Sequence, residues 1–113
     1  MAITSEIIGK LGGADVEVIP VDGTAGSSVN SVTLANIEIP AGETWLVSVV
    51  GTIINDRDSE SSWAALEVGS VSAKFNGASG ISIVATKSVT VRLRRNRTLG
   101  SDSFTGHVYT VKM

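Results

Sequence analysis

The stretch VTLANIEIPAGETWLVSVVGTIIN, residues Val32–Asn55, decides the fold. It contains two apolar segments, residues 32–39 and residues 45–50, joined by the turn-forming residues Pro40–Glu43. The pattern predicts two β-strands that pair as a hairpin. The second segment is an almost unbroken apolar run, so we expect it to cross the middle of a sandwich and to be covered on both faces.

Alternation along the second strand predicts which side chains form the core. Trp45, Val47 and Val49 fall on one side and are expected to form one buried row. Leu46 and Val50 fall on the other side, where we expect a second apolar layer.

Shorter strands are predicted around this pair. The parity of the apolar residues in the first strand changes at Ala35–Asn36, which indicates a bulge. Polar or glycine-rich stretches, among them residues 22–31 and 76–80, are typical of loops and turns. About eight short strands predict an all-β fold, an antiparallel β-sandwich or jelly roll. The remaining expected strands are residues 16–18, 63–68, 71–75, 81–85, 89–94 and 104–113, with a hairpin between the second and third of these.

Residues 1–13 are expected to form a short helical segment ahead of a β-sandwich domain of residues 14–113. Thr4 is a suitable N-cap, and Gly12–Gly13 ends the helical pattern. Two helical turns are marginal in water, so we expect the segment to be helical only when docked, as an anchor to a neighbouring subunit or a larger particle. The alternative is a frayed terminus. The apolar side of the anchor consists of Ile3, Ile7, Ile8 and Leu11.

Length and charge exclude several classes of protein. A chain of 113 residues is one domain by size, and it has no cysteine for disulfides or thiolate metal sites. Its net charge of −2 argues against binding to nucleic acid through bulk charge. The start of the chain lacks the pattern of a signal peptide, and no apolar run approaches the roughly 20 residues that span a bilayer.

The composition predicts self-association. Only 18% of the residues are charged and only 4% are aromatic, so aliphatic residues supply the apolar content. A small domain so poor in charge exposes apolar surface as a monomer, and such surface is commonly an interface. We therefore expect a homo-oligomer, a trimer in particular. The alternative is a tight aliphatic core beneath a surface of serine, threonine and glycine.

The sequence carries little catalytic chemistry. A nucleophile–base arrangement would need His107, the single histidine, together with Asp102 and a serine. His107 lies in an alternating strand pattern, where a packed or edge position is expected instead. Asp56, Asp58 and Glu60 have a spacing that suits calcium, but the pattern of a calcium loop is incomplete. We therefore expect no catalytic site, no metal and no cofactor.

One basic group stands out. Arg92 and Arg94 fall on the outward side of a predicted strand, where a phosphate or an acidic partner surface can dock. The alternative is protection of an edge strand against aggregation. The possible partner-binding patch consists of Arg92, Arg94, Arg95 and Arg97.

Two stretches of the chain resemble a known family. SEIIGKLGG, residues 5–13, and IEIPAGETWLVSVVG, residues 37–51, are similar to small virion proteins of tailed bacteriophages, particularly those of actinobacterial hosts. The second stretch also resembles a strand pair in the trimeric jelly-roll heads of phage tails and of the TNF/C1q kind. The resemblance implies a structural or adsorption role in a virion, made in the host cytoplasm, and not an enzyme.

The combined expectation is an accessory structural protein of a phage particle. It would act as a capsid decoration protein or as a minor tail component, with capsid or tail proteins as partners. The alternative from another class is a carbohydrate-binding module that recognises host-surface glycans. A glycan binder is expected to show Trp63, Tyr109 or a phenylalanine flat on the surface beside Asp or Asn, whereas a decoration protein buries its aromatics.

Overall fold

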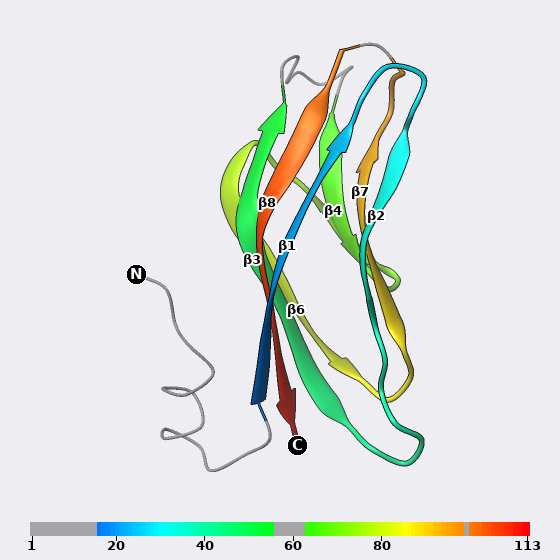
Figure 1. Ribbon diagram of the computed structural model, residues 1–113, viewed down its shortest axis with the longest axis vertical. Coiled ribbons are helices and arrows are strands. Elements are labelled where there is room, and N and C mark those ends of the chain that lie inside the picture. The colour runs from blue at the N-terminus through cyan, green and yellow to red at the C-terminus, as the bar shows by residue number, and fades with distance from the viewer. Residues whose placement is uncertain (1–15, 56–62, 99) are drawn as a thin grey trace.

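Eight antiparallel strands form two sheets that pack face to face in the computed structural model, which describes residues 16–55, 63–98 and 100–113 (Figure 1). This confirms the expected all-β sandwich. The helix and anchor expected in residues 1–13 lie outside the described residues. The strands are β1 (Val16–Ala25), β2 (Ser31–Ile37), β3 (Trp45–Asn55), β4 (Ala64–Val68), β5 (Val71–Lys74), β6 (Gly77–Ala85), β7 (Val89–Arg95) and β8 (Asp102–Lys112).

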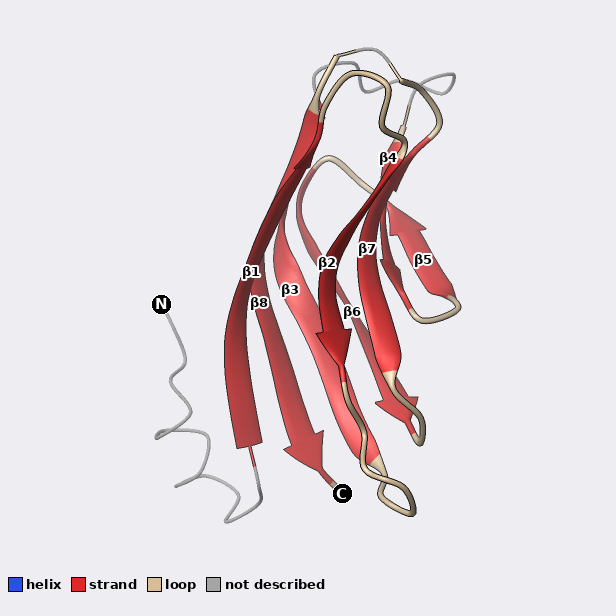
Figure 2. Cartoon of the chain, turned by 45° about the vertical axis from the view of Figure 1, so that its right-hand side comes forward, coloured by secondary structure: helices blue, strands red, loops and turns tan. Residues whose placement is uncertain are grey.

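The strand order is that of a jelly roll. The first sheet has the order β1-β8-β3-β6, and the second sheet has the order β2-β7-β4-β5. The chain passes from one sheet to the other at every connection except the β4–β5 hairpin (Figure 2). Because β8 pairs with both β1 and β3, the last strand of the chain lies in the interior of the first sheet.

The hairpin predicted for residues 32–55 is wrong. β2 is an edge strand of the second sheet and pairs with β7, whereas β3 lies inside the first sheet. The turn itself is present, since the Glu43 amide donates to the Pro40 carbonyl over 3.1 Å and Gly42 has a φ of 82°. The turn belongs to a connection that crosses between the two sheets, so it brings β2 and β3 to opposite layers.

The predicted core row is confirmed on one side of β3. Val47 and Val49 are fully buried, and Trp45 packs against the core. Leu46 and Val50 lie on the outer side, where no described element covers them, so the expected second layer is wrong. The second sheet packs against only one face of the first. The largest fully buried side chains are Phe104, Ile53, Leu66, Leu93, Val47, Val49, Val68, Val91 and Val108.

Two glycine-rich stretches predicted to be loops are partly strands, although residues 26–30 do form the connection between β1 and β2. β1 continues through Pro20 to Ala25, and β6 begins at Gly77. Pro20 is tolerated because β1 is an edge strand. A Cβ at Gly23 would lie 2.6 Å from the Leu34 side chain, so glycine here permits close packing of the sheets.

Two smaller predictions are confirmed. β4 and β5 form a hairpin in which Gly69 has a φ of 62°. The register of β2 against β7 shifts between Thr33 and Ala35, next to the predicted bulge.

Candidate interaction surface

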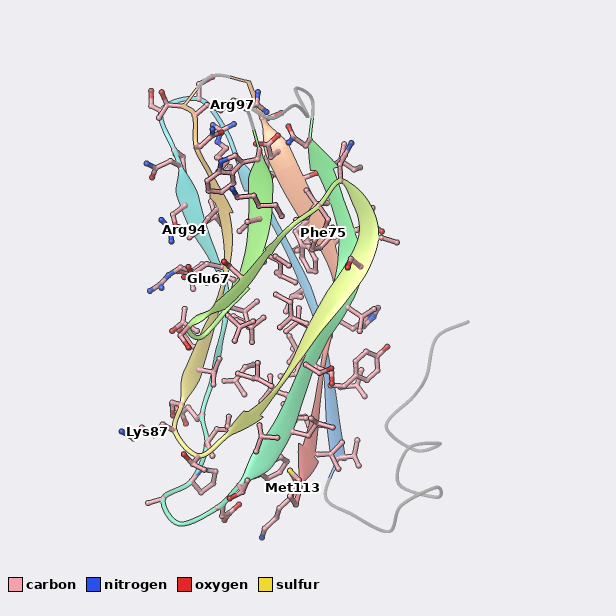
Figure 3. The ribbon with its side chains drawn as sticks, turned by 180° about the vertical axis from the view of Figure 1, so that it is seen from behind. Glu67, Phe75, Lys87, Arg94, Arg97 and Met113 are labelled. Atoms are coloured by element: carbon pink, nitrogen blue, oxygen red, sulfur yellow. The ribbon has the colours of Figure 1, made fainter. Side chains whose placement is uncertain are left out.

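The outer face of the second sheet is charged and internally paired. Glu67 of β4 accepts hydrogen bonds from Arg94 (2.9 Å) and from Arg92 (3.3 Å), both on the neighbouring strand β7. The labels Glu67 and Arg94 lie together along this side of the molecule in Figure 3. On the same sheet, the Lys74 ammonium sits 4.4 Å from the centroid of the Trp63 ring.

The hydrogen bond from Arg94 is the main cause that lowers the pKa of Glu67 below its ordinary value of 4.5. Burial opposes the effect, and the hydrogen bond from Arg92 adds to it. Because the pKa is lowered in the folded state, the stability that the pairing contributes is fully present above pH 4.5. It is lost as the pH falls through the folded-state value.

Glu67→Gln is expected to cost less than about 1 kcal/mol at neutral pH, since both arginines are half-exposed and solvent screens the pairs. The difference in unfolding free energy between this variant and the unaltered protein should shrink as the pH is lowered below 4.5. Urea denaturation at neutral and acid pH measures it. A difference that stays constant over this range would contradict the pairing.

The remaining two arginines lie at one end of the sandwich, in a buried ionic cluster. Arg95 contacts Asp102 over 3.5 Å, and neither side chain is exposed. Arg97 binds the same carboxylate over 2.7 Å and the Asn55 side-chain oxygen over 2.8 Å.

Arg95 also joins the loops at this end of the molecule. Its Nε donates to the Val29 carbonyl over 2.7 Å, and its Nη1 donates to the Gly100 carbonyl over 3.1 Å. Its Nη2 donates to the Gly26 carbonyl. One arginine thus ties the β1–β2 and β7–β8 connections together.

The structure therefore divides the predicted basic patch between two places. Arg92 and Arg94 lie on the outer face of the second sheet, while Arg95 and Arg97 lie in the ionic cluster. Only the first pair is available to an acidic partner, and it is already bonded to Glu67. Figure 3 labels one residue from each place, Arg94 and Arg97.

The outer face of the first sheet differs from that of the second sheet in carrying very little charge. Its side chains alternate with the buried residues of β1, β8, β3 and β6. Among the described residues whose side chains face outward from this sheet, Asp22 is the single Asp, Glu, Lys or Arg. We refer to this surface as the outer face, and it consists of Val16, Val18, Pro20, Asp22, Thr24, Leu46, Ser48, Val50, Thr52, Ile54, Ala78, Gly80, Ser82, Val84, Ser103, Thr105, His107, Tyr109 and Val111.

Strand register brings the aliphatic residues of the outer face into a continuous row. Val16 pairs with Val111, Val111 pairs with Leu46, and Leu46 pairs with Val84. A band of aliphatic side chains therefore crosses all four strands. Such pairs stabilise the sheet. Val84 is exposed, whereas Val16, Leu46 and Val111 are partly buried.

Nine of the nineteen residues of the outer face have polar side chains, and some of them interact with one another. The Ser48 and Ser82 hydroxyl groups form a hydrogen bond of 2.8 Å across β3 and β6. The rings of His107 and Tyr109 lie 6.1 Å apart in a tilted arrangement. Burying this surface would remove one carboxylate and several hydroxyl groups from water, so an interface over it has to supply hydrogen bonds to them.

Several large aliphatic side chains on the outer face are exposed. Val50, Val84 and Ile54 have exposed fractions of 49%, 60% and 65%. They belong to β3 and β6, neighbouring strands of one sheet. Ser48 and Ser82 lie between Val84 and Val50, and Thr52 lies between Val50 and Ile54, so the exposed aliphatic side chains are spaced along two paired strands.

The other candidate residues do not form a site. His107 lies on the outer face, whereas Asp102 points to the buried side of the same strand, so these two do not meet. Asp56, Asp58 and Glu60 lie outside the described residues, as do the anchor residues named above. Within the described ranges, no group of three or more His, Asp or Glu side chains is placed to hold a metal ion.

The described part of the chain contains no helix that is long and apolar enough to cross a membrane. Comparison with protein-family models, with curated proteins and with solved structures finds no match to this chain.

Proposed function

We propose that this protein is an accessory structural component of a bacteriophage particle, a capsid decoration protein or a minor tail component. It acts by assembling as a trimer in the virion, with capsid or tail proteins as partners. The observation that carries the proposal is the outer face, a four-stranded, nearly uncharged surface with exposed aliphatic residues. The jelly roll is a common fold of viral capsid domains, which agrees with this role.

The distribution of aromatic residues favours a structural role over the glycan-binding alternative. Phe104 is fully buried, and Trp45 and Phe75 pack against the core. Trp63 carries the Lys74 ammonium group over its ring. Tyr109 lies beside His107 on the outer face, where a subunit interface would cover both rings.

Light scattering after size-exclusion chromatography is expected to give three times the chain mass of 11.7 kDa. Val50→Lys should convert the trimer to a monomer, because each interface would then bury an unpaired ammonium group. Ser72→Lys is the matched control. It also adds one lysine at an exposed strand position, but on the outer face of the second sheet, and should leave the mass unchanged.

A Val50→Lys variant that remains a trimer would place the interface elsewhere. The virion role is tested separately, by electron microscopy of purified phage particles labelled with an antibody against this protein. Regularly spaced label on heads or tails is the expected result. Particles without label would contradict the virion role, whatever the oligomeric state.

A further inference from the structure

An open cavity of 460 Å³, with a lining of mixed polar and apolar residues, lies at the edge formed by β1 and β2. It is at the end of the sandwich opposite the ionic cluster, since Trp45 at the start of β3 lines it and Asn55 at the end of β3 contacts Arg97. Its volume is in the range of protein sites for small ligands and side chains, roughly 300–1,000 Å³. None of its lining residues belongs to the outer face.

One part of the cavity wall is apolar. Ile37 and Ile39 are buried, and Ile19 and Trp45 pack against the core beside them. Trp45 is fixed by the chain itself, because its indole N–H donates to the Glu43 carboxylate over 2.9 Å. A ligand would therefore meet a preformed surface of aliphatic groups and one indole.

Two carboxylates at the rim give the cavity its charge. Glu17 and Glu38 are exposed, and no lining residue is basic. Within the described ranges neither carboxylate has an ion pair, whereas Glu43, Glu67 and Asp102 each have one. The cavity thus combines a partly apolar wall with negative charge that the described chain leaves uncompensated.

One buried polar group adds to the lining. Thr110 of β8 is 4% exposed and also lines the cavity.

We propose that this cavity binds a lysine or arginine side chain of another protein. The aliphatic stem would lie on the isoleucines, and the cationic end would lie between the Glu17 and Glu38 carboxylates. A tryptophan ring attracts a cation by its quadrupole. An acidic side chain would be repelled, and a neutral aliphatic one would leave both carboxylates uncompensated. The inference rests on the cavity alone and not on assembly through the outer face.

The test measures binding of Nα-acetyl-lysine N-methylamide and of the arginine analogue to the full chain. The indole N–H signal of Trp45 in two-dimensional NMR and Trp45 fluorescence in a Trp63→Phe background report binding. Both probes should give saturable changes that weaken with added salt. The analogue of norleucine, which has a similar stem but no charge, should bind more weakly.

Variants then identify the carboxylates. The double variant Glu17→Gln, Glu38→Gln should weaken binding of the lysine probe by roughly two- to tenfold, the range for two solvent-exposed ion pairs. Asp22→Asn is the matched control, since it removes a carboxylate that also lacks an ion pair in the described chain but lies on the outer face. It should leave binding unchanged.

Three results would overturn the proposal. The first is that neither probe gives a saturable change. The second is that the norleucine analogue binds as tightly as the lysine probe, which would make the cavity a purely apolar site. The third is that Asp22→Asn weakens binding as much as the double variant does, which would mean attraction by overall charge. Each of these can occur while the protein remains a trimer, so the two proposals fail independently.

Discussion

The Val49→Asp variant is expected not to fold. Val49 has no exposed surface, and its strand β3 is paired on both sides, with Ile81 and with Val108 opposite it. A carboxylate at this position would be buried without a partner, at a cost of several kcal/mol against a total stability of roughly 5–15 kcal/mol. Circular dichroism and thermal denaturation of the purified variant measure the effect.

Val50→Asp is the matched control for this experiment. It places the same charge one residue further along β3, on the half-exposed outer face. This variant should fold, although the charge is expected to disrupt assembly. A soluble Val49→Asp protein with an unchanged melting temperature would contradict the assignment of β3 as the central core strand.

Asp102→Asn is expected to lower the free energy of unfolding by about 3–5 kcal/mol. The change removes the negative charge shared by Arg95 and Arg97, so the buried Arg95 guanidinium loses the carboxylate that it contacts over 3.5 Å. The cluster also joins the loops at this end, so the loss should extend to their packing. The melting temperature should fall by roughly 10–20 °C.

Glu67→Gln provides the comparison for the buried cluster. Glu67 also binds two arginines, but those arginines are half-exposed on the outer face of the second sheet. The loss should stay below about 1 kcal/mol. Equal losses of unfolding free energy for Asp102→Asn and Glu67→Gln would show that the burial of Arg95 does not determine how much stability the Asp102→Asn variant loses.

Alternation within a single strand was sufficient to predict which side chains face the core. Val89, Val91 and Leu93 of β7 are buried, and Arg92 and Arg94 face solvent, as the period of two requires. When the same period of two is continued from Leu93 to the next alternate residue, it places Arg95 on the buried side of β7. The sequence therefore contained the signal for a buried arginine, but its partner Asp102 belongs to another strand and could not be identified.

Strand pairing was not predictable from local pattern. The residues that form the turn at Pro40–Glu43 are compatible with a hairpin and with a crossing between sheets. The choice depends on whether β3 finds better partners than β2, and those partners, β6 and β8, come later in the chain. Glycine residues were wrongly interpreted as turn residues for a related reason. Gly23 and Gly80 lie within strands, where the absence of a Cβ allows the Leu34 side chain and the Val49 carbonyl group, respectively, to approach closely.

The outer face could be predicted only in composition. Low charge indicated exposed apolar surface somewhere, but the row of aliphatic residues arises from the register of four strands that are distant in sequence. The cavity could not be predicted for the same reason. Glu17 lies in β1 of the first sheet, whereas Glu38 directly follows β2 of the second sheet. Neither the outer face nor the cavity produces a recognisable pattern within one stretch of the sequence.

The interior position of β8 constrains synthesis of the protein. Among the eight described strands β1 leaves the ribosome first, yet its sheet partner β8 is the last of the eight to be made. Until β8 emerges, β1 has no neighbour in its sheet and one edge of the apolar strand β3 is open. Formation of such long-range strand pairs is slow, and until they form the nascent chain exposes unpaired strand edges that are prone to aggregation. Chains that terminate before residue 102 therefore lack the strand that joins β1 to β3, and they are substrates for chaperones rather than for assembly.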